Sequence, residues 1–307
     1  MKEDIRLDGK VALVTGGGRG LGRSMTLALV EAGAHVVAAD LIAENLEQVA
    51  EEAVSLSNTG VLHGVPADIR RPEDCRRIVE AALDCFGSLD ILINNAGLLP
   101  SYAYPGRFLE DAAPAKFWNL SDDVIQDVID TNFVAPDRLT RYAVPHMIEK
   151  GWGRIVNVTT RLTTMNRTGA SPYGASKAAL EMASEIWMKD LDGTGVTVNI
   201  LNPGAAVDTP GFATPEEKRV ATASGRLHMM HPDQMRAPAV WLVSHATDGV
   251  NGMRYDAVSW DAIRPAAEQA VLHGRLLGFE LKPKANGNGI EARDDRPATG
   301  TRADYQP

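Results

Sequence analysis

Tyr173 and Lys177 are the residues whose types and spacing most directly predict chemistry. A spacing of four residues on a helix places the phenol and the ammonium on one face. A tyrosine normally titrates at about pH 10, and a neighbouring cation stabilises the phenolate and lowers its pKa. Such a pair could exchange a proton with a substrate near neutral pH. Ser171 and Pro172 are predicted to be the N-cap and the first residue of the helix. The alternative is a core tyrosine beside a solvent-exposed lysine.

A glycine-rich turn near the N-terminus predicts a dinucleotide site. The segment Thr15–Gly22 lies between a strand-like run and a helix-like run. Glycines in such a turn allow a tight bend, a close approach to pyrophosphate and packing of the helix on the strand. The helix N-terminus adds N–H groups and a positive dipole that favour phosphate. The predicted cofactor contacts here are Gly16, Gly18, Arg19, Gly20, Leu21 and Gly22.

Asp40 ends the second predicted strand, 18 residues after Gly22. A carboxylate at this strand tip can accept hydrogen bonds from the adenosine ribose, and it would repel the additional phosphate of NADP. Arg19 favours the opposite choice, because a basic residue in the turn could pair with that phosphate. We weigh Asp40 more heavily and expect NAD in preference to NADP, with Leu41 also in contact with the cofactor.

Short apolar runs alternate with helix-like segments over most of the chain. This pattern is typical of a parallel sheet covered by helices on both faces, and right-handed crossovers make such a fold doubly wound. We therefore expect an α/β fold with a Rossmann-type doubly wound parallel sheet of about seven strands. The predicted strands are Val11–Thr15, His35–Asp40, Val61–Ala67, Leu89–Ile93, Arg154–Val158, Val196–Leu201 and Met253–Val258.

The chain is expected to form a single dinucleotide-binding and catalytic domain over residues 1–280. Residues 281–307 are rich in Gly, Pro, Asn and mixed charge, and they are predicted to be a mobile tail. The segment Leu98–Leu120 holds prolines and aromatic residues and is predicted to be a loop. Its aromatic side chains could form the wall of an apolar pocket or pack against another subunit.

Composition and charge argue against several classes of protein. With 31 basic and 40 acidic residues the formal net charge is −9, and 44% of residues are hydrophobic. These values argue against disorder and against nucleic acid as a partner. No run is apolar enough to span a membrane. Cys75 and Cys85 fit neither a disulfide framework nor a zinc pattern, so a cytoplasmic location is expected. No metal site is predicted, because His228 and His231 lack further ligands.

The motifs taken together resemble the short-chain dehydrogenase/reductase family, in its short single-domain branch. The resemblance covers roughly residues 8–258, with the motifs in the family's order and at about its spacing. It rests on Thr15–Gly22, Asp68, Asn94–Gly97, Asn132, Tyr173–Lys177, Pro203 and Gly204.

The resemblance implies roles for these positions. Tyr173 would be the general acid/base, Lys177 would lower its pKa and bind the nicotinamide ribose, and Asn132 would hold a water in the proton relay to Lys177. The remaining implied cofactor contacts are Asp68 and Ile69 at the adenine, Asn95, Ala96 and Gly97 along the cofactor, Pro203 and Gly204 over the nicotinamide, and Thr209.

Two positions depart from the family pattern. Thr160 stands 13 residues before the predicted acid/base, where the family usually has a serine. Threonine keeps the hydroxyl that would bind the substrate oxygen, while its methyl group crowds the pocket. The alternative is that Thr160 only ends a strand and that catalysis is impaired. The turn after Pro203 is also one residue longer than usual, with Asp208 before Thr209. A substrate lid is expected from Pro210 to about Met230.

The resemblance implies an NAD(P)-dependent oxidoreductase that interconverts a small-molecule secondary alcohol and a ketone by hydride transfer, with NAD preferred. It also implies a homotetramer or a homodimer. One alternative is a dinucleotide-binding regulatory protein that has lost catalysis, which Thr160 and the altered turn would favour. Another is an epimerase or dehydratase of the family's longer branch, which the glycine spacing disfavours.

Overall fold

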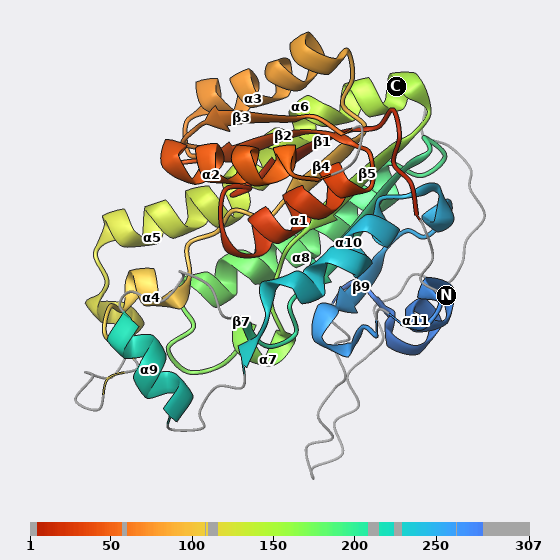
Figure 1. Cartoon of the computed structure of the whole chain (residues 1–307). Helices are drawn as coiled ribbons and strands as arrows, with labels where there is room; N and C mark the ends of the chain where they lie inside the picture. Colours follow the sequence, from red (N-terminus) through yellow and green to blue (C-terminus); the bar gives the residue numbers. More distant parts are fainter. Residues whose placement is uncertain are drawn as a thin grey trace, which may run out of the picture. The chain divides into compact units, whose positions relative to one another are not determined.

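The computed structural model describes residues 5–56, 60–107, 109, 116–207, 215–223, 229–261 and 263–278 (Figure 1). Backbone contacts group residues 1–277 into one unit and residues 278–307 into another. Only Gly278 of the second unit is described, so the expected domain end and mobile tail lie outside the described residues. No helix in the described part is both long and apolar enough to cross a bilayer.

The main sheet of the described chain has eight strands in the order β10-β9-β6-β5-β4-β1-β2-β3. All neighbouring strands run parallel except β9 and β10. The predicted doubly wound parallel sheet is thus confirmed. The strands are β1 (Val11–Thr15), β2 (His35–Asp40), β3 (Leu62–Pro66), β4 (Ile91–Asn94), β5 (Gly153–Asn157), β6 (Val196–Asn202), β9 (Met253–Asp256) and β10 (Arg275–Leu276).

The predicted number of strands is one too low, because β10 leaves no signal in the sequence. Its two residues are exposed, and they pair antiparallel with Arg254 and Met253 of β9. So short an exposed strand carries no apolar run. A separate pair of strands, β7 (Ala206–Val207) and β8 (Met229–Met230), is apolar but only two residues long, which is too short for a periodic signal.

Helices cover both faces of the sheet (Figure 1). They are α1 (Gly20–Glu31), α2 (Ala43–Val54), α3 (Pro72–Phe86), α4 (Pro100–Ala103), α5 (Asp122–Ile129), α6 (Ala135–Lys150), α7 (Leu162–Met165), α8 (Tyr173–Asp190), α9 (Pro215–Ala223), α10 (Arg236–Leu242) and α11 (Ala266–His273). Single 3-10 turns lie at Phe117–Asn119, Pro232–Met235, His245–Thr247 and Ala257–Ser259, and a π-helical turn lies at Asp130–Val134.

Alternate residues of the central strands divide the core into two clusters. Ala12 and Val14 of β1 belong to the cluster formed with α1 and α10. Val11 and Leu13 of the same strand belong to the opposite cluster, formed with α3, α6 and one end of α8. Because both faces are covered, the strand is buried along its whole length, which is why it is an unbroken apolar run in the sequence.

Helix α8 begins one residue later than predicted. Tyr173 is its first residue, Pro172 takes the cap position without a side-chain hydrogen bond, and the Ser171–Pro172 peptide bond is cis. The predicted N-cap role of Ser171 is therefore wrong. The first helical bonds are accepted by the carbonyls of Ala170 and Pro172, while the carbonyl of Ser171 accepts the Tyr104 hydroxyl at 3.0 Å.

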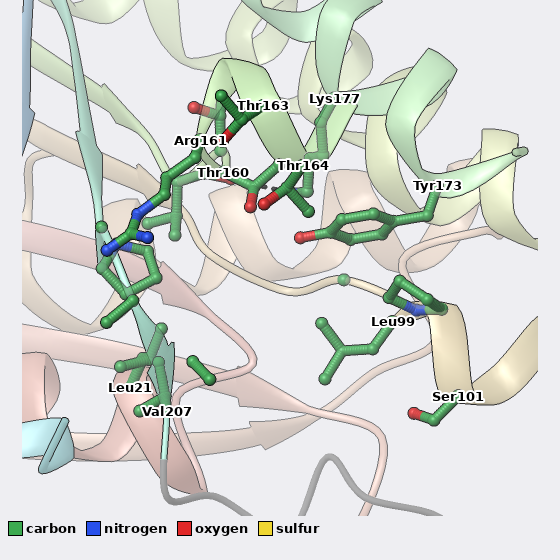
Figure 2. Close-up of a pocket in the computed structure, with 18 of the residues that line it drawn as sticks. Leu21, Leu99, Ser101, Thr160, Arg161, Thr163, Thr164, Tyr173, Lys177 and Val207 are labelled. Atoms are coloured by element: carbon green, nitrogen blue, oxygen red, sulfur yellow. Dashed lines mark hydrogen bonds between the residues drawn. The ribbon is translucent and has the colours of Figure 1, made fainter. Parts of the chain in front are cut away.

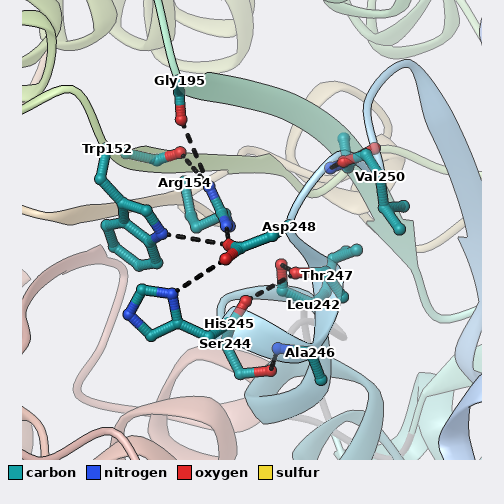
Figure 3. Close-up of polar contacts among 12 residues, drawn as sticks. Trp152, Arg154, Gly195, Leu242, Ser244, His245, Ala246, Thr247, Asp248 and Val250 are labelled. Atoms are coloured by element: carbon teal, nitrogen blue, oxygen red, sulfur yellow. Dashed lines mark hydrogen bonds and ion pairs between the residues drawn. The ribbon is translucent and has the colours of Figure 1, made fainter.

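A polar cluster holds the start of β5 against the turn after α10 (Figure 3). The Arg154 side chain is 2% exposed, and its guanidinium pairs with the Asp248 carboxylate. The Trp152 indole donates to the same carboxylate at 3.2 Å, and the His245 ring lies 3.1 Å from its other oxygen. The carboxylate therefore compensates a guanidinium that is almost completely removed from water.

Replacing Asp248 by asparagine should destabilise the fold, because the buried guanidinium of Arg154 then loses its carboxylate. We expect the free energy of unfolding to fall by about 2 kcal/mol, within the range typical of hydrogen bonds to charged groups. Urea denaturation measures the change, with Asp192→Asn at an exposed position as the matched control. A loss no larger than that of the control would contradict this role of the cluster.

Candidate active site

Two adjoining pockets lie at the edge of the sheet where β1, β4, β5 and β6 have their carboxyl ends. One, which we call the α8 pocket, has a volume of about 430 Å³. The other, the glycine-turn pocket, has a volume of about 360 Å³. Both are lined by Leu21, Asn95, Gly97 and Leu99, so they form a continuous groove. The groove crosses the boundary between β4 and β1, the switch point at which ligands bind in open α/β sheets.

The glycine turn has the shape of a phosphate cradle. Gly16 and Gly20 have φ angles of 62° and 55°, in the left-handed region that favours glycine. A Cβ on Gly22 would lie 1.9 Å from the Gly16 carbonyl oxygen, so α1 can pack this closely only through glycine. Helix α1 has neither a capping side chain nor an acidic residue in its first turn. Its N-terminal N–H groups and dipole can therefore serve a phosphate.

The predicted contacts of the turn divide into two groups. Those that line the glycine-turn pocket are Gly16, Arg19, Gly20 and Leu21. Gly18 and Gly22 lie outside the lining, and Gly18 instead donates its N–H to the Asp40 carboxylate at 3.1 Å. The other Asp40 oxygen accepts the Ile42 N–H, also at 3.1 Å. Asp40 lines the pocket together with Leu41 and is 7% exposed. Asp40 thus also stabilises the turn, which its place in the sequence does not reveal.

Asp68 and Ile69 line the glycine-turn pocket just after β3. The Asp68 carboxylate lies 2.7 Å from the Arg70 guanidinium, which also contacts Asp127 of α5 at 2.6 Å. Hydrogen bonds from Arg70 lower the pKa of Asp68, which keeps the carboxylate charged. The Tyr102 hydroxyl donates to Asp127 as well. These contacts connect the end of β3 to α4 and α5.

Thr15 connects the ends of β1 and β4. Its hydroxyl accepts the N–H groups of Asn95 and Ala96, each at 3.1 Å, and the Asn95 amide donates to the Thr15 carbonyl at 2.9 Å. Asn95, Ala96 and Gly97 line the glycine-turn pocket. The threonine before the glycines was a signal for this role, because its hydroxyl is short enough to satisfy backbone groups of a neighbouring strand.

Tyr173 and Lys177 lie on one side of α8, and both line the α8 pocket. They are 6% and 4% exposed, which excludes a solvent-exposed lysine. The Lys177 ammonium donates to the Val158 carbonyl at 2.8 Å. Burial lowers the pKa of Lys177 to about 8, because a charged ammonium loses its hydration there.

The pKa of Tyr173 does not fall as predicted. Burial raises it above its usual value, while the side chain of Thr160, as a hydrogen-bond partner, and the charge of Arg167 act in the opposite direction. Lys177 is not among the groups that shift it. The loss of water around the buried phenol raises its pKa by more than the neighbouring charge lowers it.

The loop between β5 and α8 forms the wall opposite Tyr173. Figure 2 shows the Tyr173 hydroxyl, Thr160 and Thr164 turned toward the same part of the α8 pocket. Thr160 therefore lies within the cavity and does not merely end a strand. The residues of this loop that line the pocket are Thr159, Thr160, Arg161, Thr163, Thr164 and Arg167.

Asn132 lies beside the pocket rather than in its wall. It is fully buried in the π-helical turn, and its amide donates to the Leu98 carbonyl and the Ser176 hydroxyl, each at 3.0 Å. The protein therefore uses both amide hydrogens. Pro136, four residues on, has no N–H to donate to the Asn132 main-chain carbonyl. Gly97 separates this turn from Lys177: a Cβ there would lie 3.2 Å from Asn132 Oδ1 and 3.4 Å from Lys177 Nζ.

Pro203 and Gly204 line the α8 pocket after β6. Gly204 has a φ of 72°, and a Cβ on it would lie 2.8 Å from the Cβ of Asp256, so the turn requires glycine. The Pro203 carbonyl accepts the Val258 N–H at 3.0 Å. Thr209 lies outside the described residues, as do residues 210–214 and 224–228 of the expected lid.

A buried ion pair lies beneath Thr159 and Thr160. Glu181 of α8 is fully buried and Arg254 of β9 is 5% exposed, and their side chains are 2.6 Å apart. The same guanidinium donates to the Thr160 carbonyl at 2.6 Å, and the Thr159 hydroxyl donates to Glu181 at 3.2 Å. The pair therefore connects the Thr160 backbone to the helix of Tyr173. The sequence holds one signal for this pair. Arg254 lies inside a predicted strand, and Glu181 stands four residues after Lys177, on the same face of the predicted helix.

The aromatic side chains of the Leu98–Leu120 segment do not form the wall of the α8 pocket in the described part of the chain. The segment contributes residues 99–101 to that pocket, and Tyr102 lines the glycine-turn pocket instead. Phe117 and Trp118 are 63% and 66% exposed, and Phe108 lies outside the described residues.

The groove fits an extended dinucleotide. The uncapped start of α1 and its glycines suit a pyrophosphate, Asp40 provides a buried carboxylate near one end, and Tyr173 and Lys177 lie near the other. Among the described residues, no group of three or more His, Cys, Asp or Glu side chains could bind a metal ion.

Lys177 should make the stability of the protein rise as the pH rises from 8 toward 10. Its pKa is about 8 in the folded chain and 10.5 for an ordinary lysine. In that interval the unfolded chain binds more protons than the folded chain, so the free energy of unfolding increases with pH. Between about pH 7.5 and pH 9.5 the increase should be about 2 kcal/mol. Urea denaturation of the wild type and of Lys177→Met measures it, and an equal pH dependence of the two would refute the lowered pKa.

Comparisons with known proteins agree with this geometry. Residues 10–219 match the sequence model of the short chain dehydrogenase family. A 3-oxoacyl-[acyl-carrier-protein] reductase of Thermotoga maritima is 29% identical over 251 residues, which are 81% of this chain and 96% of that protein. An L-fucose dehydrogenase of Bos taurus is 32% identical over 257 residues, which are 80% of this chain and 87% of that protein.

Two solved structures share the fold. A putative short-chain alcohol dehydrogenase of Sinorhizobium meliloti has a TM-score of 0.70 at 26% identity, over 82% of this chain and 96% of that one. A putative NAD(P)-dependent gluconate 5-dehydrogenase of Beutenbergia cavernae, with NADP bound, has a TM-score of 0.68 at 29% identity, over 82% of this chain and 96% of that one. With the family match over most of its length, the chain belongs to the short chain dehydrogenase family of NAD(P)-dependent oxidoreductases.

Proposed function

We propose that the protein interconverts a secondary alcohol and a ketone, with NAD as the hydride carrier. The observation that carries the proposal is the composition of the α8 pocket. Tyr173, Lys177 and Thr160 line this one cavity, and it continues into the groove beside the glycine turn. A substrate in the α8 pocket would therefore lie next to the nicotinamide end of a dinucleotide that occupies the groove.

The cofactor, when bound, supplies the hydride chemistry, and the protein supplies binding and orientation. The start of α1 would hold the pyrophosphate, because its N–H groups and dipole favour negative charge. The residues that would contact the cofactor are Gly16, Arg19, Gly20 and Leu21 at the turn, Asp40, Leu41, Asp68 and Ile69 at the adenosine end, and Asn95, Ala96, Gly97, Lys177, Pro203 and Gly204 toward the nicotinamide.

Tyr173 would exchange a proton with the substrate oxygen. In reduction, the phenol would donate its proton to the oxygen of the ketone, and in oxidation the phenolate would accept the proton of the alcohol. Because burial raises the pKa of Tyr173, the phenol is its resting form. Lys177 would stabilise the phenolate when it forms, since both side chains are almost completely buried and line the same cavity. Asn132 would hold a relay water through its main-chain carbonyl, because its amide is already used.

Thr160 would bind the substrate oxygen through its hydroxyl. The Thr160 side chain already opposes the rise in the pKa of Tyr173, so it acts on the phenol oxygen itself. Its methyl group takes up space that a serine would leave open, which would restrict the bulk of the substrate near the reacting carbon.

The proposed preference for NAD depends on Asp40. Its carboxylate lines the pocket and is fixed by two backbone N–H groups, so an additional phosphate on the ribose would meet a fixed negative charge. Arg19 is exposed on the same pocket and favours NADP. We weigh the buried carboxylate more heavily, because a flexible surface arginine is screened by solvent.

We further propose a homotetramer or homodimer in the cytoplasm. On α8, Met182 and Ile186 are 41% and 49% exposed, and this apolar surface would suit contact with a second copy. Cys75 and Cys85 are both free thiols, as a reducing compartment maintains them.

Tyr173→Phe should abolish turnover while leaving dinucleotide binding intact. The variant removes the proton donor and keeps the ring, so we expect kcat to fall by at least about 100-fold, as is typical when acid–base catalysis is lost. Nicotinamide absorbance with a panel of secondary alcohols and ketones measures kcat, and fluorescence titration with NADH measures binding. Tyr142→Phe is the matched control, because Tyr142 of α6 lines neither pocket.

The same assay tests the remaining parts of the proposal. Turnover that survives in Tyr173→Phe would contradict the acid/base role. NADH binding by the wild type without turnover of any panel member would argue against the oxidoreductase proposal for these substrates. A higher kcat/KM with NADP than with NAD would show that Arg19 outweighs Asp40.

Arg254 should act as a positioning residue for Thr160. Arg254→Met removes the bond to the Thr160 carbonyl and leaves Glu181 buried without its partner, so stability should also fall. We expect kcat to fall about tenfold or more, with little change in the affinity for NADH, because the guanidinium lines neither pocket. Steady-state kinetics and NADH titration measure the two quantities.

A double variant separates positioning from stability. In Arg254→Met with Glu181→Leu no uncompensated charge is buried, so stability should recover relative to the single variant while kcat stays low. Recovery of kcat together with stability would contradict a positioning role. Arg254→Lys should restore the ion pair but only part of kcat, because one ammonium cannot reproduce the fixed, forked geometry of a guanidinium.

A further inference from the structure

The charged side chains among the described lining residues of the α8 pocket are all positive. Arg161 and Arg167 line it together with Lys177, and no Asp or Glu is among its described lining residues. Within the described part of the chain, neither arginine side chain pairs with a carboxylate. Both are exposed side chains that border the pocket, whereas the buried Arg154 and Arg254 each contact a carboxylate.

The two arginines lie at either end of the short helix α7. Arg161 is the residue before α7, and Figure 2 shows its guanidinium on the opposite side of the pocket from Tyr173. Arg167 follows α7 and lines the same pocket as Tyr173, and its charge acts to lower the pKa of that phenol. A molecule in contact with Tyr173 is therefore exposed to the field of both guanidinium groups.

A third arginine increases the positive charge behind this wall. The Arg107 guanidinium donates to the Gly169 carbonyl at 3.3 Å, close to Arg167 in the chain. Burial and the charge of Arg167 both lower its pKa, which shows that the two cations repel each other, while Glu217 partly offsets this. Neither Glu217 nor Asp256, which packs under Gly204, lines the pocket. The charged side chains among the described lining residues of the pocket are therefore all positive.

We propose that the substrate carries an anionic group, a carboxylate or a phosphate ester, and that Arg161 and Arg167 bind this group while the reacting carbon lies at Tyr173. The inference rests on the proposed function and adds the charge of the substrate to it. Guanidinium groups recognise carboxylate and phosphate through paired charge-assisted hydrogen bonds. A hydroxy acid, a keto acid or a sugar phosphate satisfies this requirement, whereas a hydrocarbon alcohol leaves both cations without a partner.

Matched pairs of ketones test the proposal. The compounds are levulinate with levulinamide, and dihydroxyacetone phosphate with dihydroxyacetone, each reduced with NADH. Within at least one pair we expect the anion to have a kcat/KM higher by about tenfold or more, mainly through KM. The pair that shows the larger ratio distinguishes a carboxylate subsite from a phosphate subsite.

The variants Arg161→Gln and Arg167→Gln assign the effect to the pocket. In one or both of them the ratio of anionic to neutral kcat/KM should fall by roughly 10- to 100-fold, the amount expected when a charge-assisted hydrogen bond is lost. Arg167→Lys should retain part of the ratio. The matched control is Arg141→Gln, at an exposed arginine of α6 that lines neither pocket, and its ratio should equal that of the wild type.

A binding assay keeps this test separate from the proposed function. Calorimetric titration of the NADH-bound protein should show tighter binding of levulinate or dihydroxyacetone phosphate than of its neutral partner, with the difference lost in the variants. If this binding preference is found without any turnover, the anion subsite stands and the oxidoreductase proposal fails. If the neutral ketones are reduced with the same kcat/KM as the anionic ketones, the oxidoreductase proposal stands and the anion subsite is refuted.

The same arginines could instead contact the cofactor, and the affinity for NADH decides between these roles. Under our proposal the Kd for NADH changes little in Arg161→Gln and Arg167→Gln. A Kd that rises about tenfold in these variants, while the ratio of anionic to neutral ketone stays constant, would refute the proposal. Equal affinity for anionic and neutral ketones in both assays would refute it as well.

Discussion

The parallel pairing of β2, β1, β4, β5 and β6 brings the carboxyl ends of these strands to one edge of the sheet. The groove forms at this edge between β4 and β1, where the strand order reverses and ligands bind in open α/β sheets. Residues as distant in sequence as Gly16 and Tyr173 therefore line adjoining pockets. The bonds between Thr15 and Asn95 hold the two central strand ends together at the switch point.

Removal of water governs the chemistry at this edge. Tyr173 and Lys177 are almost completely buried, so the pKa of the phenol rises and that of the ammonium falls. Both shifts favour the neutral form of the side chain. For Tyr173, Thr160 and Arg167 oppose the shift. The Lys177 ammonium donates to the Val158 carbonyl, and the Tyr173 hydroxyl faces Thr160 and the cavity (Figure 2).

Buried charge elsewhere in the fold is compensated within the protein. Arg154 pairs with Asp248, and Arg254 pairs with Glu181, because an isolated buried guanidinium would be costly. The loop around α7 differs, since its arginines border the cavity and no described carboxylate pairs with them. Both arginines are exposed side chains that border the cavity, so their guanidinium groups are available to an anionic ligand there.

The sequence by itself determined the class of fold, the glycine turn and the residues that gather at the groove. Strands buried on both faces are unbroken apolar runs, and glycines are required where φ is positive or a Cβ would clash, so local pattern was sufficient for these features. The tertiary structure alone decided the raised pKa of Tyr173 and the bonds of Asp40 to two backbone N–H groups. It also decided the hydrogen bonds of the Asn132 side chain and the hydrogen bond from Arg254 to the Thr160 carbonyl. Each depends on burial or on contacts between segments far apart in the chain, and neither quantity is encoded in the spacing of neighbouring residues.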